Sequence, residues 1–209
     1  EANDPTVKAA IIKCIPVFCL CLFVLNQGMS LQQEDLYKLK IFMGLLFSLP
    51  GDFFLVWEFY GNFFLYGVVF FAIAHVFYSL ALGFSPLRPI LGVIIISLIG
   101  VVYYCYLPNL EGLYVPIIAI YMCIIGVVVW RAIARLLSLD EGKCKWSQMI
   151  ASFGALIFGL SDFILGTNKW IVHLPYARVL IMVTYWIGQM LLALSTVNLG
   201  IYKLQEKQN

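Results

Sequence analysis

The sequence has few charged residues, and this shortage identifies the class of protein. Asp, Glu, Lys and Arg together make up 11% of its 209 residues, whereas a soluble domain carries roughly 25%. Hydrophobic residues reach 63%, and the mean hydropathy is +0.95. Too few charges remain to coat a surface that faces water, and the net charge of +2 does not indicate a nucleic-acid partner. The composition therefore predicts an integral membrane protein.

Long polar segments are also missing, so the chain has no room for a second, soluble domain. Seven apolar stretches are each long enough to cross roughly 30 Å of hydrocarbon as a helix. They cover residues 8–25, 38–57, 62–83, 89–107, 113–136, 147–166 and 177–200. The breaks that indicate loops include residues 32–35, 85–89, 108–112 and 138–145. We predict an all-α transmembrane bundle of seven spans that forms a single membrane domain over residues 1–209.

Histidine is nearly absent, which argues against a metal centre. The chain has two histidines, and His173 lies in a predicted loop away from His75, so a three-histidine zinc site cannot form. The six cysteines show no metal-ligand spacing, and all but the last lie within or beside apolar stretches: Cys14, Cys19, Cys21, Cys105, Cys123 and Cys144. We interpret the cysteines as small buried hydrophobes rather than disulfide partners, and we expect no cofactor.

Basic residues are distributed unevenly between the two predicted faces of the membrane. One face has only Lys8, Lys169 and Arg178, while Lys13 lies within the first span. The other face collects Lys38, Lys40, Arg88, Arg131, Arg135, Lys143, Lys145, Lys203 and Lys207. Because Lys and Arg accumulate on the cytosolic side, we expect the C-terminus in the cytosol and the start of this chain on the opposite side.

Ionisable residues inside a span are costly and usually face the interior of the bundle. Five lie inside or at the end of predicted spans: Lys13, Asp52, His75, Asp162 and Arg178. Ser48 and Gly44 share the helical face of Asp52, and Ala155, Gly159 and Gly166 share the face of Asp162. Small residues allow helices to approach closely. Both carboxylates are therefore expected to face protein, at a similar depth nearer the non-cytosolic side.

The remaining polar residues of the spans have two interpretations. His75 has Tyr78 one turn along, and Tyr185 and Gln189 share one face of the last span. These side chains either line a cavity together with the carboxylates, or they pack and form hydrogen bonds between helices. In the same way, an intramembrane Asp is either catalytic or a structural partner of Lys13 or Arg178.

A weak internal repeat relates two parts of the chain. Residues 47–55 (Phe-Ser-Leu-Pro-Gly-Asp-Phe-Phe-Leu) resemble residues 158–165 (Phe-Gly-Leu-Ser-Asp-Phe-Ile-Leu), four spans later. His75 and Gln189 occupy comparable places in the spans that follow. An even offset preserves helix direction, so the pattern predicts a parallel four-plus-four duplication with the polar site at the interface of the repeats.

These polar residues lie in motifs that resemble the YhhN-like family, the lysoplasmalogenases, and especially its animal members. The motifs follow one another in order over the whole chain. They are Ile12-Lys13-Cys14-Ile15-Pro16, Gly51-Asp52 through Trp57, Ala74-His75-Val76-Phe77-Tyr78, Gly83 through Leu87, Ser161-Asp162 through Asn168-Lys169-Trp170, and Ala177-Arg178 through Tyr185 with Gln189 through Ser195. The resemblance implies eight spans, hence one span before this chain, and the endoplasmic reticulum membrane.

The resemblance also implies an activity, the hydrolysis of the vinyl ether bond of lysoplasmalogens. The products are a fatty aldehyde and glycerophosphocholine or glycerophosphoethanolamine. Protonation of the β-carbon gives an oxocarbenium ion, water captures it as a hemiacetal, and the hemiacetal collapses. This route requires a protonated acid and a second carboxylate that guides water and stabilises positive charge, as in glycosidases. We expect Asp52 and Asp162 to take these roles, in an order that the sequence leaves open.

Other residues are expected to support the site. Lys13, Lys169 and Arg178 are candidates for binding the phosphate of the lysophospholipid substrate, although Lys169 fits equally well as an anchor that snorkels to the interface. Side chains that could orient the carboxylates or the water are His75, Tyr78, Tyr185 and Gln189.

The alternative is a proton-coupled transporter or a lipid-binding membrane protein without catalysis. Paired Asp residues, a Lys and a repeat also occur in carriers. The sequence leaves open the headgroup preference, the leaflet that supplies the substrate and whether the protein forms a homodimer.

Overall fold

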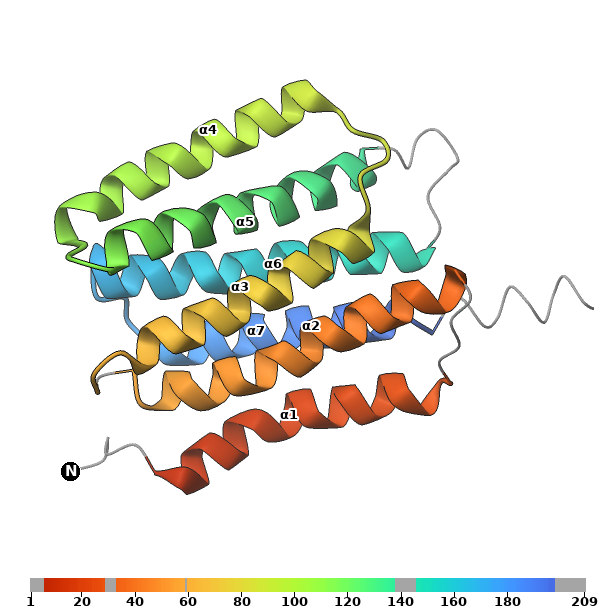
Figure 1. Ribbon diagram of the computed structural model, residues 1–209, viewed down its shortest axis with the longest axis horizontal. Helices are drawn as coiled ribbons and strands as arrows, with labels where there is room; N and C mark the ends of the chain where they lie inside the picture. The colour runs from red at the N-terminus through yellow and green to blue at the C-terminus, as the bar shows by residue number, and fades with distance from the viewer. Residues whose placement is uncertain (1–5, 29–32, 59, 138–145, 198–209) are drawn as a thin grey trace, which may run out of the picture.

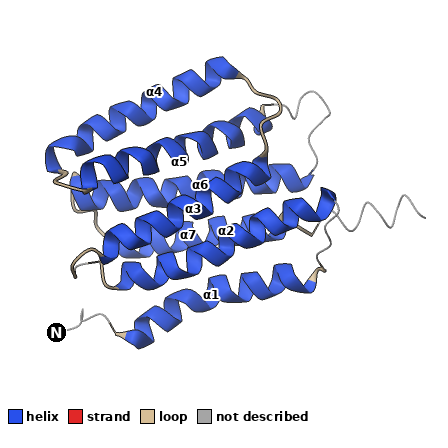
Figure 2. Ribbon diagram, in the orientation of Figure 1, coloured by secondary structure: helices blue, strands red, loops and turns tan. Residues whose placement is uncertain are grey.

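The computed structural model describes residues 6–28, 33–58, 60–137 and 146–197. In these ranges it contains seven long helices, and successive helices run in opposite directions (Figure 1). They are α1 (Val7–Asn26), α2 (Gln33–Val56), α3 (Phe63–Leu82), α4 (Pro89–Tyr106), α5 (Tyr114–Leu136), α6 (Trp146–Trp170) and α7 (Ala177–Leu194), with a 3₁₀ helix η1 (Leu107–Asn109) after α4. Within these ranges there is no strand (Figure 2). All seven helices are long and apolar enough to cross a membrane. The predicted all-α membrane bundle is confirmed.

The helix bounds differ from the predicted spans at three places. Helix α2 begins at Gln33, so residues 33–35 are helical although a loop was predicted there. Helix α6 continues to Trp170 instead of ending at 166, and α7 ends at Leu194. Helices α2 and α6 are longer than predicted because hydropathy detects only the part of a helix within hydrocarbon, and polar side chains extend a helix into the hydrated interface. Residues 138–145 of the predicted loop and 198–200 of the last span lie outside the described residues.

Helices α1 and α4 form opposite edges of the bundle (Figure 1). Helix α4 packs on α5, whereas α3, α5 and α6 are the most buried helices. Large apolar side chains of α4, among them Ile90, Val93 and Leu98, are exposed. Such an apolar exterior is what a surface in contact with lipid requires, so the described part of the chain has the surface of an integral membrane protein.

The packing of the helices has the symmetry that the predicted duplication requires. Helix α1 packs on α2 and α7, and in the same way α5 packs on α6 and α3. The pair α2 and α3 corresponds to the pair α6 and α7. Asp52 in α2 and Asp162 in α6 therefore occupy matching helices. The duplication itself stays a prediction.

Two glycines allow α6 and α7 to touch through their backbones. A Cβ atom built at Gly154 would lie 2.9 Å from the carbonyl oxygen of Gly188, and one built at Gly188 would lie 2.9 Å from the backbone nitrogen of Phe158. A real side chain at either position would force the helices apart. This contact fixes the register between Asp162 on α6 and Tyr185 on α7.

Replacing Gly188 by Val is expected to destabilise the bundle by about 1–3 kcal/mol, because the added atoms meet backbone that cannot move aside. The measurement is the thermal midpoint of the purified protein in detergent. Gly100→Val is the matched control, since a Cβ at this helical position meets nothing within 4 Å. Equal midpoints for the two variants would contradict the proposed backbone contact.

Basic residues gather at the end of the bundle where α2 and α4 begin and α5 ends. This is the end that the distribution of Lys and Arg in the sequence predicts to face the cytosol. Arg131 is fully buried there and donates to the carbonyl oxygens of Gly83 (2.6 Å) and Pro86 (2.7 Å). The Lys40 ammonium donates to the carbonyl oxygen of Leu80 (3.1 Å). Part of this basic end thus holds the α3–α4 connection in place. Lys143, Lys145, Lys203 and Lys207 lie outside the described residues, and the cytosolic assignment stays a prediction.

The cysteines correct one interpretation. None of the five in the described ranges forms a disulfide, but Cys19, Cys105 and Cys123 are exposed rather than buried, and Cys14 is half-buried. Only Cys21 among them is buried. The reason is that an apolar residue on a lipid-facing helix needs no burial in protein. Cys144 lies outside the described residues.

Candidate active site

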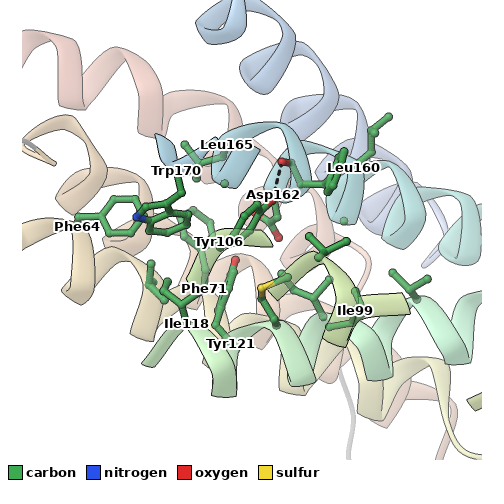
Figure 3. Close-up of a pocket in the computed structure, with 18 of the residues that line it drawn as sticks. Phe64, Phe71, Ile99, Tyr106, Ile118, Tyr121, Leu160, Asp162, Leu165 and Trp170 are labelled. Atoms are coloured by element: carbon green, nitrogen blue, oxygen red, sulfur yellow. Dashed lines mark hydrogen bonds between the residues drawn. The ribbon is translucent and has the colours of Figure 1, made fainter. Parts of the chain in front are cut away.

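An apolar cavity of about 290 Å³ lies mainly between α3, α4, α5 and α6 (Figure 3). Its walls are formed by Leu55, Phe64, Val68, Phe71, Ile99, Val102, Tyr106, Ile118, Tyr121, Met122, Ile125, Val129, Leu156, Gly159, Leu160, Asp162, Phe163, Leu165, Gly166 and Trp170. Asp162 is the one charged residue among these lining residues. A hydrophobic cavity with a single ionisable group is a typical binding site for an amphiphilic ligand.

Asp162 is paired with His75 across the α3–α6 contact. The Nε2 atom of His75 lies 2.7 Å from Oδ2 of Asp162. The imidazole is fully buried, and its Nδ1 has no hydrogen-bond partner among the described residues. Tyr121 lines the same cavity as Asp162. At this distance a proton can be exchanged between the imidazole and the carboxyl group. Asp162 in the cavity wall and His75 behind it therefore form an acid–base pair.

Asp52 belongs to a second polar cluster, formed by α1, α2 and α7. The Tyr185 hydroxyl donates to Oδ2 of Asp52 (2.6 Å), and the Lys13 ammonium lies 3.5 Å from Oδ1. Asp52 is buried, while the Lys13 side chain keeps 19% of its surface exposed. The Tyr185 hydroxyl satisfies Oδ2, whereas Oδ1 has the Lys13 cation nearby but no hydrogen-bond partner among the described residues. This geometry fits the structural alternative for Asp52, a partner for Lys13.

Tyr78 and Gln189 form hydrogen bonds between helices. The Tyr78 hydroxyl donates to Oε1 of Gln189 (2.6 Å), and Nε2 of Gln189 donates to Oγ of Ser48 (2.9 Å). The Tyr78 ring lies against Gly44, where any side chain would collide with it. All of these groups are buried. They connect α2, α3 and α7, and neither Tyr78 nor Gln189 lines the cavity.

Aromatic rings lie between the two carboxylate clusters. The Phe158 ring centroid is 4.5 Å from that of His75 and 5.2 Å from that of Tyr185. Phe71 contacts Tyr185 as well (5.7 Å) and lines the cavity. The two carboxylates therefore have separate partners, and of the two only Asp162 reaches the cavity.

The predicted cations occupy three different surroundings. Lys13 pairs with Asp52. Lys169 lies 4.2 Å from the centroid of the Phe64 ring and 3.5 Å from Oε2 of Glu58, beside the cavity end that Phe64 and Trp170 line (Figure 3). Arg178 is exposed at the start of α7, and within the described ranges it has no ion pair with either Asp.

Several residues of the site gave no signal in the sequence. Tyr121 and Phe158 lie within uniformly apolar stretches, where an aromatic residue is ordinary. Glu58 follows the predicted end of the second span by one residue, and nothing in the sequence points to it as a site residue. Its partner Lys169 lies near the end of a predicted span on the same side of the membrane. This shared position is the one sequence signal for an ion pair between Glu58 and Lys169. Within the described ranges, no three His, Cys, Asp or Glu side chains are placed to hold a metal ion.

Comparisons with known proteins agree with the motifs found in the sequence. The model of the YhhN family matches residues 8–196. The chain is 39% identical over 196 residues to the human lysoplasmalogenase TMEM86A, covering 94% of this chain and 81% of the relative. It is 33% identical over 193 residues to the lysoplasmalogenase TMEM86B of Sus scrofa (92% and 77%) and 26% identical over 245 residues to a lysoplasmalogenase homolog of Dictyostelium discoideum (92% and 79%). No solved structure matches the chain.

Proposed function

Because the chain belongs to the YhhN family, we propose that it is a lysoplasmalogenase, which hydrolyses the vinyl ether bond of 1-alkenyl-glycerophospholipids to a fatty aldehyde and a glycerophosphodiester. The observation that carries the proposal is the Asp162 carboxyl group in the wall of an apolar cavity, paired with the buried imidazole of His75 behind it. The substrate is a single-chain lipid whose reactive bond joins the hydrocarbon chain to the glycerol. Such a molecule requires an apolar groove with one acid at the position of that bond.

Asp162 is the proton donor in this proposal. Its carboxylic acid transfers a proton to the β-carbon of the vinyl ether, and the positive charge forms on the ether oxygen and the adjacent carbon. Water adds to that carbon and returns a proton to the carboxylate, which gives a hemiacetal. The hemiacetal then loses the glycerol oxygen as an alcohol and becomes the aldehyde. His75, 2.7 Å from Asp162, holds the carboxyl group in place and exchanges protons with it between these steps.

Asp52 acts one layer behind the reacting atoms. It binds the Tyr185 hydroxyl, the Tyr185 ring packs on Phe158, and Phe158 packs on His75. Asp52 is thus a positioning residue that keeps the aromatic wall and the imidazole in register. This division of labour departs from a mechanism in which both carboxylates contact one water molecule.

Asp52→Asn is expected to lower kcat about tenfold and to leave KM nearly unchanged. The neutral amide accepts a weaker hydrogen bond from Tyr185 than the carboxylate does, and a loss of about 1.4 kcal/mol in the arrangement of the site corresponds to tenfold in rate. The measurement is steady-state aldehyde release by the purified variant. Lys13→Met, which removes the cation of the same cluster, is the companion variant. A loss for Asp52→Asn as deep as that for an Asp162 variant would mean that Asp52 takes part in the chemical step.

The function itself is tested with wild-type protein in detergent. We expect aldehyde release from a 1-alkenyl lysophospholipid without added metal, and none from the corresponding 1-alkyl ether, whose carbon chain cannot be protonated. If no aldehyde forms, the hydrolase proposal is wrong, and transport of the unchanged lipid becomes the measurement to make. As for location, the proposal includes the endoplasmic reticulum membrane with the C-terminus in the cytosol.

A further inference from the structure

One end of the cavity carries a pair of opposite charges beside its wall. The Lys169 ammonium lies 3.5 Å from Oε2 of Glu58, and both side chains are about one-quarter exposed (22% and 25%). The same ammonium lies over the ring of Phe64, which lines the cavity together with the neighbouring residue Trp170. Figure 3 shows Phe64 and Trp170 at this end, Ile99 at the other end and Asp162 between them.

From this arrangement we infer that Lys169 and Glu58 form the headgroup site, and that the site selects lipids whose headgroup carries both a phosphate and an ammonium group. The inference rests on the proposed function. Lys169 binds the phosphate, and Glu58 binds the ethanolamine or choline nitrogen. The ion pair between the two residues is exchanged for two ion pairs with a zwitterionic headgroup.

The spacing along α6 suits this arrangement. Lys169 follows Asp162 by seven residues, which is two helical turns. Both side chains therefore lie on the same face of α6, and their backbones are roughly 10 Å apart along the helix. A flexible Lys side chain shortens this span further. The remaining distance is comparable to the glycerol segment that separates the vinyl ether oxygen from the phosphate. With the phosphate at Lys169, the vinyl ether lies at Asp162.

The opposite end of the cavity excludes the reverse orientation. Beyond Asp162 the described lining consists of apolar side chains such as Ile99, Ile125, Val129 and Leu156. A phosphate placed among them would lose its hydration without gaining a partner, whereas a hydrocarbon chain is stable there. The charge pair and the apolar end therefore fix the direction in which the lipid enters.

The two charges also explain why a zwitterion is preferred over an anion. A lipid with a bare phosphate headgroup pairs with Lys169 but leaves the Glu58 carboxylate without its cation and close to a second negative charge. Such unfavourable contacts are the usual source of discrimination between related ligands. Neutralising Glu58 removes the repulsion, so the preference is expected to disappear with it.

The experiment compares kcat/KM for 1-alkenyl-glycerophosphoethanolamine and 1-alkenyl-glycerol-3-phosphate, which differ in the ammonium group. For wild-type protein we expect the zwitterionic lipid to be favoured about tenfold, the size of one charge-assisted contact. Glu58→Gln is expected to abolish this ratio, and Lys169→Gln to lower kcat/KM for both lipids through KM. Glu111→Gln and Lys8→Gln change exposed charges elsewhere and are expected to change neither value.

The outcomes separate this inference from the proposed function. If wild-type protein cleaves neither lipid, the proposed function fails. If it cleaves both and Glu58→Gln keeps the wild-type ratio, the function stands and the headgroup site is wrong. Glu58→Asp and Lys169→Arg preserve the charges and are expected to preserve the ratio, which distinguishes a headgroup site from a loss of folding at this end of the bundle.

Discussion

Replacing Asp162 by Asn is expected to lower aldehyde release by about 10²- to 10⁴-fold, the range that a general acid contributes. The amide is nearly the same size as the carboxyl group and can still form a hydrogen bond with His75, but it cannot donate a proton to carbon. Asp162 is the one charged group among the described residues that line the cavity, so no neighbour in the wall replaces it. The measurement is kcat from initial rates of aldehyde release.

Two controls make this result specific. Glu111→Gln makes the same chemical change at an exposed turn and is expected to keep full activity. The thermal midpoint and the affinity for the uncleavable 1-alkyl lysolipid report folding and binding, and both are expected to stay near wild type in Asp162→Asn. An Asp162→Asn variant that retains more than a tenth of the wild-type kcat would rule out Asp162 as the proton donor.

The second large effect is expected at His75. His75→Gln keeps an N–H group that can reach Asp162, but it removes the group that exchanges protons with the carboxyl. We expect kcat to fall roughly 100-fold. The measurement is kcat from initial rates of aldehyde release.

His75→Phe serves as the comparison at the same position, because it removes the hydrogen bond as well and leaves Asp162 without its partner. It is expected to be the less active and the less stable of the two variants. If His75→Gln keeps wild-type activity, the imidazole only packs in the core, which is the alternative that the sequence leaves open for this residue.

The sequence was sufficient for the architecture because the signal for a membrane helix is length and apolarity, and both are local properties. It also identified Asp52, His75 and Asp162, since an ionisable group in an apolar run is conspicuous. What it could not provide was the pairing. Asp162 bonds to His75 on α3, and Asp52 bonds to Tyr185 on α7, and these partners depend on how helices far apart in the sequence pack together.

The shared depth of the two Asp residues suggested a common site, but depth does not fix rotation about the bundle axis. Phe71 and Phe158 fill the space between the two clusters. Neither phenylalanine is distinguishable from any other in an apolar helix. In the same way, Glu58 became part of the site only through its contact with Lys169, which joins the end of α2 to the end of α6.

The most direct measurement is an experimental structure of the protein with a 1-alkyl lysophospholipid, the saturated ether that binds but is not cleaved. The prediction is that the ether oxygen lies beside the Asp162 carboxyl group, with the hydrocarbon chain between α4, α5 and α6 and the phosphate at Lys169. A lipid whose ether oxygen lies beside Asp52 and Lys13, with the cavity between α3 and α6 empty, would contradict the assignment of the active site.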